Sequence, residues 1–340
     1  MLITLAPGVD PARVRHALVA LGIWTRTLVA ADGRARLLVE PHSAAVDAAD
    51  VAALDGVESV AVEPSTHPRI DAQAACVDIA GVALGAGAPP VLLAGPCSVE
   101  SEERMHRLAG RVAAAGGRFL RGGAYKPRTS PYSFQGHGEA ALLWLRNAAD
   151  AHGLRVVTEA TAEHEAALVA AHADLVQIGS RNMHNYALLR AVGVTGKPAL
   201  LKRGMAATIE EWLSAGEYLL VHGAKAVVFC ERGLRGFDAT TRNVLDVGAI
   251  ALLAHVHRQP VVADPSHAAG RRDLILPLAR AALAAGASGL IVETHDEPGC
   301  ALSDGPQALP PAELAALLRT AELPRAVPAP EGANEHRARA

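Results

Sequence analysis

Residues 118–138 read RFLRGGAYKPRTSPYSFQGHG, in which a short apolar run ends at Arg121 and is followed at once by two glycines. The apolar run is typical of a buried parallel strand, and the glycines and prolines beyond it indicate a long ordered loop. This loop carries two further cations and two hydroxyls: Lys126, Arg128, Thr129 and Ser130. Clustered cations repel one another unless an anion lies between them, and phosphate or carboxylate suits guanidinium and ammonium groups. We therefore predict an anion-binding loop, with a solvated basic turn as the alternative.

The composition suits a soluble α/β protein with an aliphatic core. The 340 residues are enough for one large domain and a small one; half are hydrophobic and only 3% are aromatic. With a net charge of −3, the chain lacks the overall positive charge typical of proteins that bind nucleic acid. No apolar run has the ~18 residues that are needed to span a bilayer. The four cysteines lack C-x-x-C spacing and no signal peptide is recognisable, so free thiols or a metal ligand are expected. We predict a cytoplasmic protein with no nucleic-acid or membrane partner.

Residues 1–66 have a pattern of their own. Strand, helix, strand, strand, helix and strand patterns follow one another, with the second helix expected over 45–54. A hairpin turn is signalled by Asp32-Gly33. The βαββαβ order is the ferredoxin-like pattern, so it predicts a small α+β domain. Residues 67–89 are predicted to be a linker followed by a short β-hairpin.

From residue 90 to residue 324 strand and helix patterns alternate. Eight apolar runs are candidate strands: 91–95, 118–122, 155–159, 175–179, 198–202, 226–230, 261–265 and 289–293. Eight parallel strands with helical crossovers predict a (β/α)₈ TIM barrel, and a doubly wound open sheet is the alternative. The tail, residues 325–340, is rich in Pro, Ala and Arg and is predicted to be disordered.

Nearly every candidate strand ends in a polar residue, at the end of the barrel where active sites are built. Six residues in this region are cations, which are costly to bury together unless anions neutralise them. They are Arg121, Lys126, Arg128, Arg181, Lys202 and Arg232. We expect a ligand with several negative charges, or two phosphorylated ligands.

A second set of strand-end residues combines a thiol, an imidazole and two carboxylates. The set is Cys97, His267, Glu293 and Asp304. These donors suit a divalent transition metal, and the first, seventh and eighth strands become neighbours when a barrel closes. From spacing alone, a metal site and four separate structural roles explain these residues equally well.

Eight motifs spread over the barrel resemble those of one enzyme family. They are AGPCSVE (94–100), LRGGAYKPRTSPYSFQG (120–136), VTEA (157–160), QIGSRNM (177–183), LLKRG (200–204), FCERG (229–233), DPSH (264–267) and ALSDG (301–305). In these motifs the chain is similar to 3-deoxy-D-arabino-heptulosonate 7-phosphate (DAHP) synthase. The N-terminal pattern is similar to the form of this enzyme that carries a ferredoxin-like regulatory domain.

The resemblance implies the first step of the shikimate route to aromatic amino acids. In this reaction phosphoenolpyruvate condenses with erythrose 4-phosphate and water, with release of phosphate. The resemblance also implies one divalent metal ion of the Mn, Fe, Co or Zn class. Its expected ligands are Cys97, His267, Glu293 and Asp304.

Roles for the other residues follow from the same resemblance. Arg181 and Arg232 are expected to bind the phosphate of phosphoenolpyruvate. The residues expected around its carboxylate and reacting carbon are Arg121, Lys126 and Lys202. Arg128 and Thr129 are expected to bind the phosphate of the aldose, with Ser130 also among the substrate-binding residues. Glu159 and Lys202 are expected to handle the proton of an attacking water, and the expected catalytic set is Lys126, Glu159, Lys202 and His267.

The architecture of residues 1–66, taken together with the resemblance, suggests regulation and assembly. Two N-terminal domains from different subunits of a homo-oligomer, with a tetramer favoured, are expected to close around tyrosine or phenylalanine and occlude the barrel mouths. A chorismate mutase is a candidate docking partner.

Two alternatives remain at this stage. The sister enzyme that condenses phosphoenolpyruvate with arabinose 5-phosphate to an octulosonate has a KANRS-like loop, whereas this chain has KPRTS at 126–130. A non-catalytic sensor of phosphorylated sugars and amino acids would have lost a ligand or a cation, and this chain retains all of them.

Overall fold

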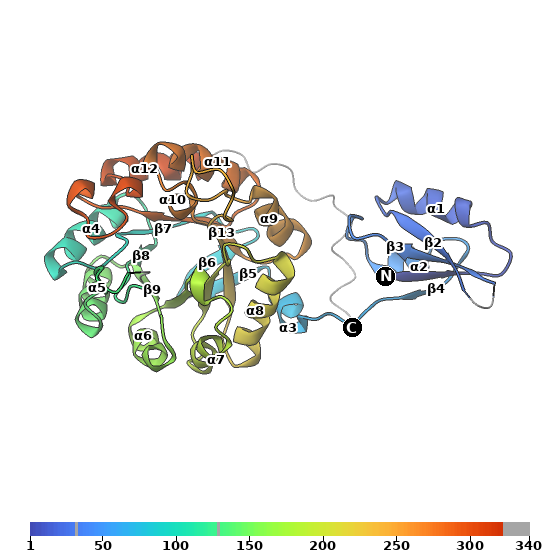
Figure 1. Cartoon of the computed structure of the whole chain (residues 1–340), viewed down its shortest axis with the longest axis horizontal. Helices are drawn as coiled ribbons and strands as arrows, with labels where there is room; N and C mark the ends of the chain where they lie inside the picture. Colours follow the sequence, from blue (N-terminus) through green and yellow to red (C-terminus); the bar gives the residue numbers. More distant parts are fainter. Residues whose placement is uncertain (31–32, 128–129, 322–340) are drawn as a thin grey trace. The chain divides into compact units, whose positions relative to one another are not determined.

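A computed structural model describes residues 1–30, 33–127 and 130–321, and the chain divides into two compact units, Met1–Thr66 and His67–Ala340. The expected tail from residue 325 lies outside the described residues. Each unit is built around its own sheet, as Figure 1 shows. No helix among the described residues combines the length and the apolar composition that crossing a bilayer requires.

The first unit is a four-stranded antiparallel sheet in the order β2-β3-β1-β4, with two helices. Its elements are β1 (Leu2–Leu5), α1 (Pro11–Ala20), β2 (Thr25–Val29), β3 (Ala35–Val39), α2 (Ala48–Ala52) and β4 (Val57–Ala61). One face of the sheet supplies Ile3, Leu5 and Leu37 to a core shared with both helices. Because successive side chains of a strand point to opposite faces, the residues between these point to the other face of the sheet. The predicted βαββαβ order and the antiparallel sheet are confirmed.

The second helix of this unit is shorter than the predicted 45–54. It begins only after Asp47, whose extended backbone (φ −63°, ψ 138°) cannot continue a helix. The Asp47 carboxylate accepts a hydrogen bond from the Ala49 N–H and so caps the first turn.

The stretch expected to be a linker contains a helix, α3 (Pro68–Ala72). Its Ile70 is fully buried in the core of the second unit, and the Glu217 carboxylate of α8 (Ile209–Val221) accepts the Arg69 and Ile70 N–H groups. These contacts join residues almost 150 positions apart, so no local pattern reveals them. The hairpin that follows is β5 (Cys76–Ile79) and β6 (Val82–Gly85).

Eight parallel strands close into a barrel in the second unit, which confirms the predicted fold class. They are β7 (Val91–Gly95), β8 (Phe119–Arg121), β9 (Arg155–Glu159), β10 (Leu175–Ile178), β11 (Ala199–Lys202), β12 (Val227–Glu231), β13 (Val261–Ala263) and β14 (Gly289–Glu293). Strand β14 pairs with β7 in a register that sets Glu293 beside Gly95, and this pairing closes the ring. Near-continuous burial of these strands is expected, since both of their faces are covered.

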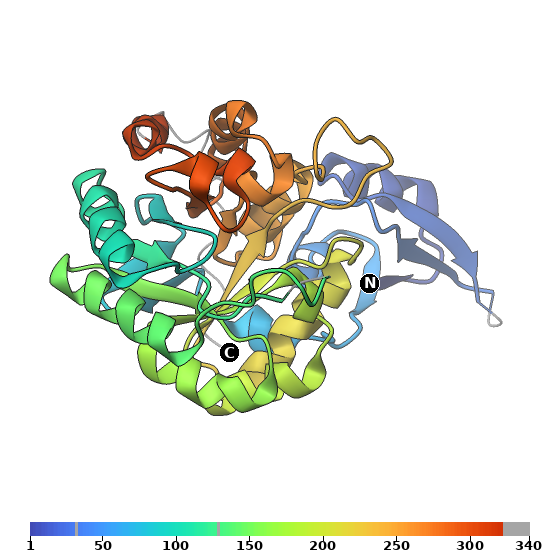
Figure 2. The ribbon, with the colours of Figure 1, turned by 60° about the vertical axis from the view of Figure 1, so that its left-hand side comes forward.

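Helices surround the barrel, as Figures 1 and 2 show. They are α4 (Glu102–Ala114), α5 (Glu139–Ala151), α6 (Ala166–His172), α7 (Tyr186–Val194), α8 (Ile209–Val221), α9 (Val247–Ala251), α10 (Pro265–Ala269), α11 (Ile275–Ala284) and α12 (Pro311–Ala321). Neighbours pack from α4 through to α8, and α12 packs against both α11 and α4. The short α10 is different, because it lies directly after β13 and carries His267.

The amino-terminal end of the barrel is closed by the β5–β6 hairpin. Val77, Ile79, Val82 and Leu84 form one apolar cluster with inward-facing residues of the barrel strands, such as Phe119. The opposite end, where the strands finish, is therefore the open one, and it is where polar side chains gather.

Candidate active site

A cavity of about 420 Å³ lies at the carboxyl ends of the barrel strands. Its lining includes most of the residues that the sequence singled out: Arg121, Lys126, Ser130, Glu159, Arg181, Lys202, Arg232, His267 and Asp304. Arg121, Lys202 and Arg232 are each about 95% buried, whereas Arg181 is exposed. Arg128 and Thr129 lie outside the described residues.

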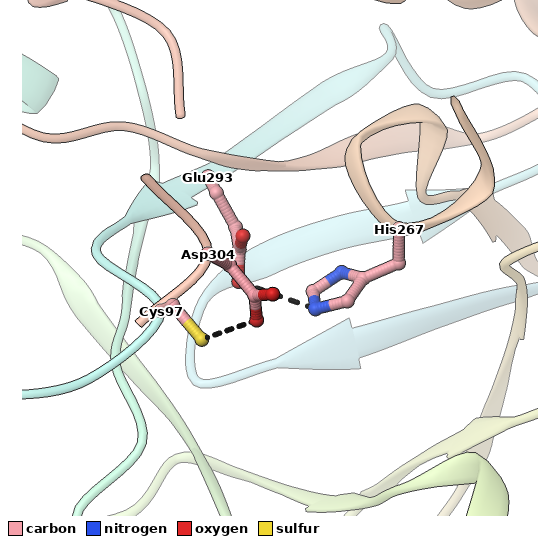
Figure 3. Close-up of side chains that lie close together, drawn as sticks. All are labelled: Cys97, His267, Glu293 and Asp304. Carbon is pink, nitrogen blue, oxygen red and sulfur yellow. Dashed lines mark hydrogen bonds and ion pairs between the residues drawn. The ribbon is translucent and has the colours of Figure 1, made fainter. Parts of the chain in front are cut away.

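Four candidate metal ligands meet at the edge of this cavity. Each of Cys97, His267, Glu293 and Asp304 offers one donor atom, and the four atoms all lie within 4.8 Å of one another. Figure 3 shows two contacts within the set: Cys97 Sγ is 3.0 Å from Asp304 Oδ2, and His267 Nε2 is 3.2 Å from Glu293 Oε1. The barrel brings them together because β14 pairs with β7 on one side and β13 on the other.

The chemistry of the four donors fits a divalent transition metal. A thiol, an imidazole nitrogen and two carboxylates are a mixed soft and hard set of the kind such ions accept. Glu293 is almost fully buried beside Asp304, and two carboxylates repel one another when no cation lies between them. Of the two interpretations that the sequence left open, the geometry favours a shared metal site.

Asp264 controls the orientation of His267. Asp264 Oδ2 lies 2.7 Å from His267 Nδ1 and 2.5 Å from Lys202 Nζ. A proton on Nδ1 leaves Nε2 directed at the other three ligands, which is how a carboxylate usually holds a metal-binding histidine. Although burial opposes it, the charges of Asp264 and Glu293 raise the pKa of His267 to about 10, so a metal that binds at Nε2 would have to displace a proton from it.

Two of the cations touch the ligand set directly. Arg121 Nη1 lies 3.1 Å from Glu293 Oε1, and Lys126 Nζ lies 3.0 Å from Cys97 Sγ and 2.9 Å from the Cys97 carbonyl oxygen. Burial opposes ionisation of Glu293, but the charges of His267 and Arg121 still hold its pKa below its usual range. The candidate metal ligands therefore form one electrostatic unit with Arg121 and Lys126.

Arg232 has no such partner. No carboxylate of the described part of the chain lies within 4 Å of its guanidinium, which donates only to the Gly233 carbonyl oxygen at 3.3 Å. Burial lowers the pKa of Arg232, which reflects the cost of holding this charge away from water. A buried cation facing a cavity without a counter-ion is suited to an anionic ligand.

One strand-end carboxylate faces away from the cavity. Glu231 pairs with Arg203 at 3.2 Å and accepts the Gly233 N–H at 2.6 Å, so it shapes the loop after β12. Glu159 is placed differently: it lines the cavity and accepts a hydrogen bond of 2.9 Å from Gln177.

Several cavity residues were not singled out from the sequence. They are Gln177, Ser180, Arg235, Arg242 and Asn243. Gln177 and Ser180 lie within the QIGSRNM motif, which could have pointed to them. Arg242 and Asn243 lie in the loop between β12 and α9, where a single T-R-N triplet gives no spacing signal.

A family model described as the DAHP synthetase I family matches residues 61–323. The phospho-2-dehydro-3-deoxyheptonate aldolase of Thermotoga maritima is 43% identical over 319 residues, covering 91% of this chain and 93% of the relative. The 2-dehydro-3-deoxyphosphooctonate aldolase of Laribacter hongkongensis is 33% identical, covering 73% of this chain and 96% of that protein.

Two solved structures, both from Thermotoga maritima, are similar to this chain. One is phospho-2-dehydro-3-deoxyheptonate aldolase (DAHP synthase), with a TM-score of 0.72 and 40% identity over 94% of this chain and 95% of that one. The other is a truncated form of 3-deoxy-D-arabino-heptulosonate 7-phosphate synthase, with a TM-score of 0.67 and 44% identity. It covers 73% of this chain and 90% of its own.

Proposed function

Because this chain belongs to the DAHP synthetase I family, we propose that it condenses phosphoenolpyruvate with erythrose 4-phosphate and water to give DAHP and inorganic phosphate. One observation carries the proposal: four metal-type donors meet beside a cavity lined by Arg121, Lys126, Lys202 and Arg232, and two of the four, His267 and Asp304, line that cavity themselves. The two substrates bring two phosphates and a carboxylate, which repel one another in water. A fixed set of cations that holds both substrates offsets this repulsion and aligns the reacting carbons.

The cations that line the cavity divide between the two ends of phosphoenolpyruvate in this proposal. Arg232, buried without a carboxylate partner, binds its phosphate together with the exposed Arg181. Arg121, Lys126 and Lys202 surround its carboxylate and the carbon that reacts. Each of these three also contacts a metal ligand or the Asp264 that holds one, so phosphoenolpyruvate would lie beside the metal site.

Glu159 and Lys202 handle the proton of the water that attacks phosphoenolpyruvate. Glu159 Oε2 already accepts from Gln177, which fixes the carboxylate at the cavity wall. Lys202 is paired with Asp264, which holds its ammonium group at the wall of the same cavity. Once water has added to the carbon that bears the phosphate, the tetrahedral product expels inorganic phosphate between the cations.

Cys97, His267, Glu293 and Asp304 would hold one divalent metal of the Mn, Fe, Co or Zn class. When bound, such an ion supplies Lewis-acid polarisation of the aldehyde oxygen of erythrose 4-phosphate. The aldehyde carbon is then open to the methylene carbon of phosphoenolpyruvate. Arg128 and Thr129, with Ser130 nearby, would hold the far phosphate of the aldose.

Phosphate release tests this function. The full-length protein with both substrates and a divalent metal should release phosphate, and a chelator should stop the reaction until metal is added back. Arabinose 5-phosphate replaces erythrose 4-phosphate in a parallel assay, since octulosonate-forming relatives are about one-third identical to this chain. Faster turnover of arabinose 5-phosphate would assign the chain to that sister reaction, and no release with either aldose would refute the proposal.

We infer a regulatory role for residues 1–66 from their architecture. The described part of this unit contains no cluster of potential metal ligands, and one face of its sheet is not covered by its own helices. Leu2 and Leu38 pair across that uncovered face, beside Arg36. Such a face suits a second copy of the same unit from another subunit, with tyrosine or phenylalanine bound between the two copies.

Deletion of residues 1–66 tests this role. The truncated enzyme should stay active and ignore both amino acids, whereas full-length enzyme should be inhibited, because an effector typically shifts such an equilibrium by about 1–3 kcal/mol. If millimolar tyrosine and phenylalanine leave the full-length enzyme unchanged, regulation is refuted. Assembly of a tetramer and docking of a chorismate mutase are then the roles to examine.

A further inference from the structure

The two carboxylates of the metal site each present one oxygen inward and one outward. Glu293 Oε1 lies 3.2 Å from His267 Nε2, and Asp304 Oδ2 lies 3.0 Å from Cys97 Sγ, so these oxygens face the other ligands. The remaining oxygens, Oε2 and Oδ1, point to two residues that had no place in the proposed chemistry. Those residues are Gln307 and Arg242.

Gln307 joins Glu293 to Arg242. Its side-chain Nε2 donates to Glu293 Oε2 at 2.6 Å, and its Oε1 accepts from Arg242 Nη1 at 3.0 Å. A guanidinium can only donate, so Arg242 must face the amide oxygen, and the amide NH₂ must then face Glu293. The amide is 98% buried and thus has one orientation that satisfies both neighbours.

Arg242 completes the bridge to the second carboxylate. The same Nη1 that donates to Gln307 also lies 3.1 Å from Asp304 Oδ1. The backbone of Asp304 is in the left-handed region (φ 52°), where aspartate is one of the few enriched residues with a side chain. Gln307 follows Asp304 by one turn of 3₁₀ helix, Gly305–Gln307. The residue that binds Glu293 Oε2 therefore belongs to the same loop as Asp304.

We propose that Gln307 and Arg242 are positioning residues for the metal site. By holding Glu293 Oε2 and Asp304 Oδ1, the pair leaves each carboxylate one oxygen for the ion and fixes the direction of that oxygen. This inference rests on the proposed metal-dependent function. The positioning role predicts that metal affinity depends on the neutral side-chain amide of Gln307, although this amide does not contact the ion.

The test is metal binding to full-length protein, measured by titrating Co²⁺ into chelator-treated wild type and Gln307→Met. Methionine matches glutamine in length but cannot donate to Glu293. We expect Co²⁺ binding to weaken by about 10- to 100-fold, as is usual when a residue that orients a ligand is lost. The thiolate-to-cobalt charge-transfer band should persist, because Cys97 remains a ligand. Unchanged affinity in folded Gln307→Met would overturn the proposal.

Arg242→Gln gives a second test that a misfolded core cannot confuse, since the Arg242 side chain is 39% exposed. Removal of a positive charge near a cation site would by itself tighten metal binding. Weaker Co²⁺ binding therefore indicates lost positioning, whereas tighter or equal binding overturns the role of Arg242. Arg271→Gln is the matched control, because Arg271 is exposed, lines with Arg242 a second cavity of about 340 Å³, and pairs with Asp273 instead of a candidate ligand. Its Co²⁺ affinity should equal that of wild type.

The outcomes separate this inference from the proposed function. A wild-type protein that binds no Co²⁺ refutes both. A wild type that binds Co²⁺ but releases no phosphate refutes the function, while the comparison with Gln307→Met still decides the positioning role. Full activity together with unchanged Co²⁺ affinity in Gln307→Met leaves the function standing and removes the inference.

Discussion

The two ends of the barrel are built from the same eight strands but by opposite rules. At the amino-terminal end the β5–β6 hairpin buries Ile79 and Leu84 against inward-facing apolar residues. At the carboxyl end, buried positions hold charges such as Arg121, Lys202 and Glu293. The amino-terminal end of the barrel thus stabilises the fold, whereas the carboxyl end carries the residues proposed for catalysis. Changes at one end should therefore alter stability, and changes at the other should alter activity.

The largest effect is expected for Cys97→Ala, which tests the carboxyl end. Loss of the thiol should abolish metal binding and phosphate release, because a soft ligand in a four-ligand site is removed. The unfolding temperature of the metal-free protein should change little. Metal binding is followed by titration and unfolding by circular dichroism. Cys300→Ala, which removes an exposed thiol, is the control, and full activity of Cys97→Ala in chelator would break the comparison.

At the other end, Leu84→Ala should behave in the opposite way. Leu84 is fully buried in the cluster that closes the barrel, so truncating it should cost about 2–5 kcal/mol of unfolding free energy. The Michaelis constants measured well below the unfolding temperature should stay as in wild type. Ala83→Ser, on the exposed face of the same strand, is the control. A large change in either Michaelis constant would show that the two ends are coupled.

A division within the carboxyl end is tested by Arg128→Ala. The residue lies outside the described part of the chain, so this prediction rests on the KPRTS motif. Loss of a charged phosphate contact should cost about 1.5–3 kcal/mol, which raises the Michaelis constant for erythrose 4-phosphate roughly ten- to a hundredfold. That for phosphoenolpyruvate should change far less. Arg118→Ala is the control, because Arg118 is exposed and lies just before β8, at the amino-terminal end of that strand. Equal effects of Arg128→Ala on both Michaelis constants would contradict the assignment.

The smallest effect is a gain in stability from Arg232→Met. Because Arg232 is buried without a carboxylate partner, replacing it with an apolar side chain should raise the unfolding free energy by about 1 kcal/mol. Arg121→Met should not stabilise the protein, since it leaves the buried Glu293 without this ion pair. Denaturant unfolding of the metal-free proteins measures both. Destabilisation by Arg232→Met would mean that this charge serves the fold.

Sequence patterns predicted the barrel well because a strand that is buried on both faces is a continuous apolar run in the sequence. Strands 91–95, 155–159 and 289–293 have the predicted bounds, since each is an apolar run between turn signals. The helix Pro68–Ala72 has no comparable apolar pattern in its sequence. Its stability comes from Ile70 and Glu217, which meet only when the chain has folded.

The site residues were predictable to the extent that they lie in motifs. Cys97 and His267 are within motifs at strand ends, and the structure brings them together with the other two proposed ligands. Gln307 and Arg242 were not predicted, because an amide and a guanidinium in separate loops have no shared spacing. Only the folded chain shows that they contact two of the proposed ligands, Glu293 and Asp304, at once.

The pairing of Cys97 with Asp304 has a consequence for biosynthesis. The two residues are 207 positions apart in the sequence, at the first and last strand ends of the barrel, yet their donor atoms are 3.0 Å apart. As the chain leaves the ribosome, Cys97 is exposed to the cell long before Asp304 has been translated. The complete set of four donors exists only after β14 has paired with β7, so a metal held by all four would bind only to a barrel that has closed. Such binding would stabilise completed molecules over unfinished ones by mass action, and the ion would then favour copies whose barrel has closed correctly.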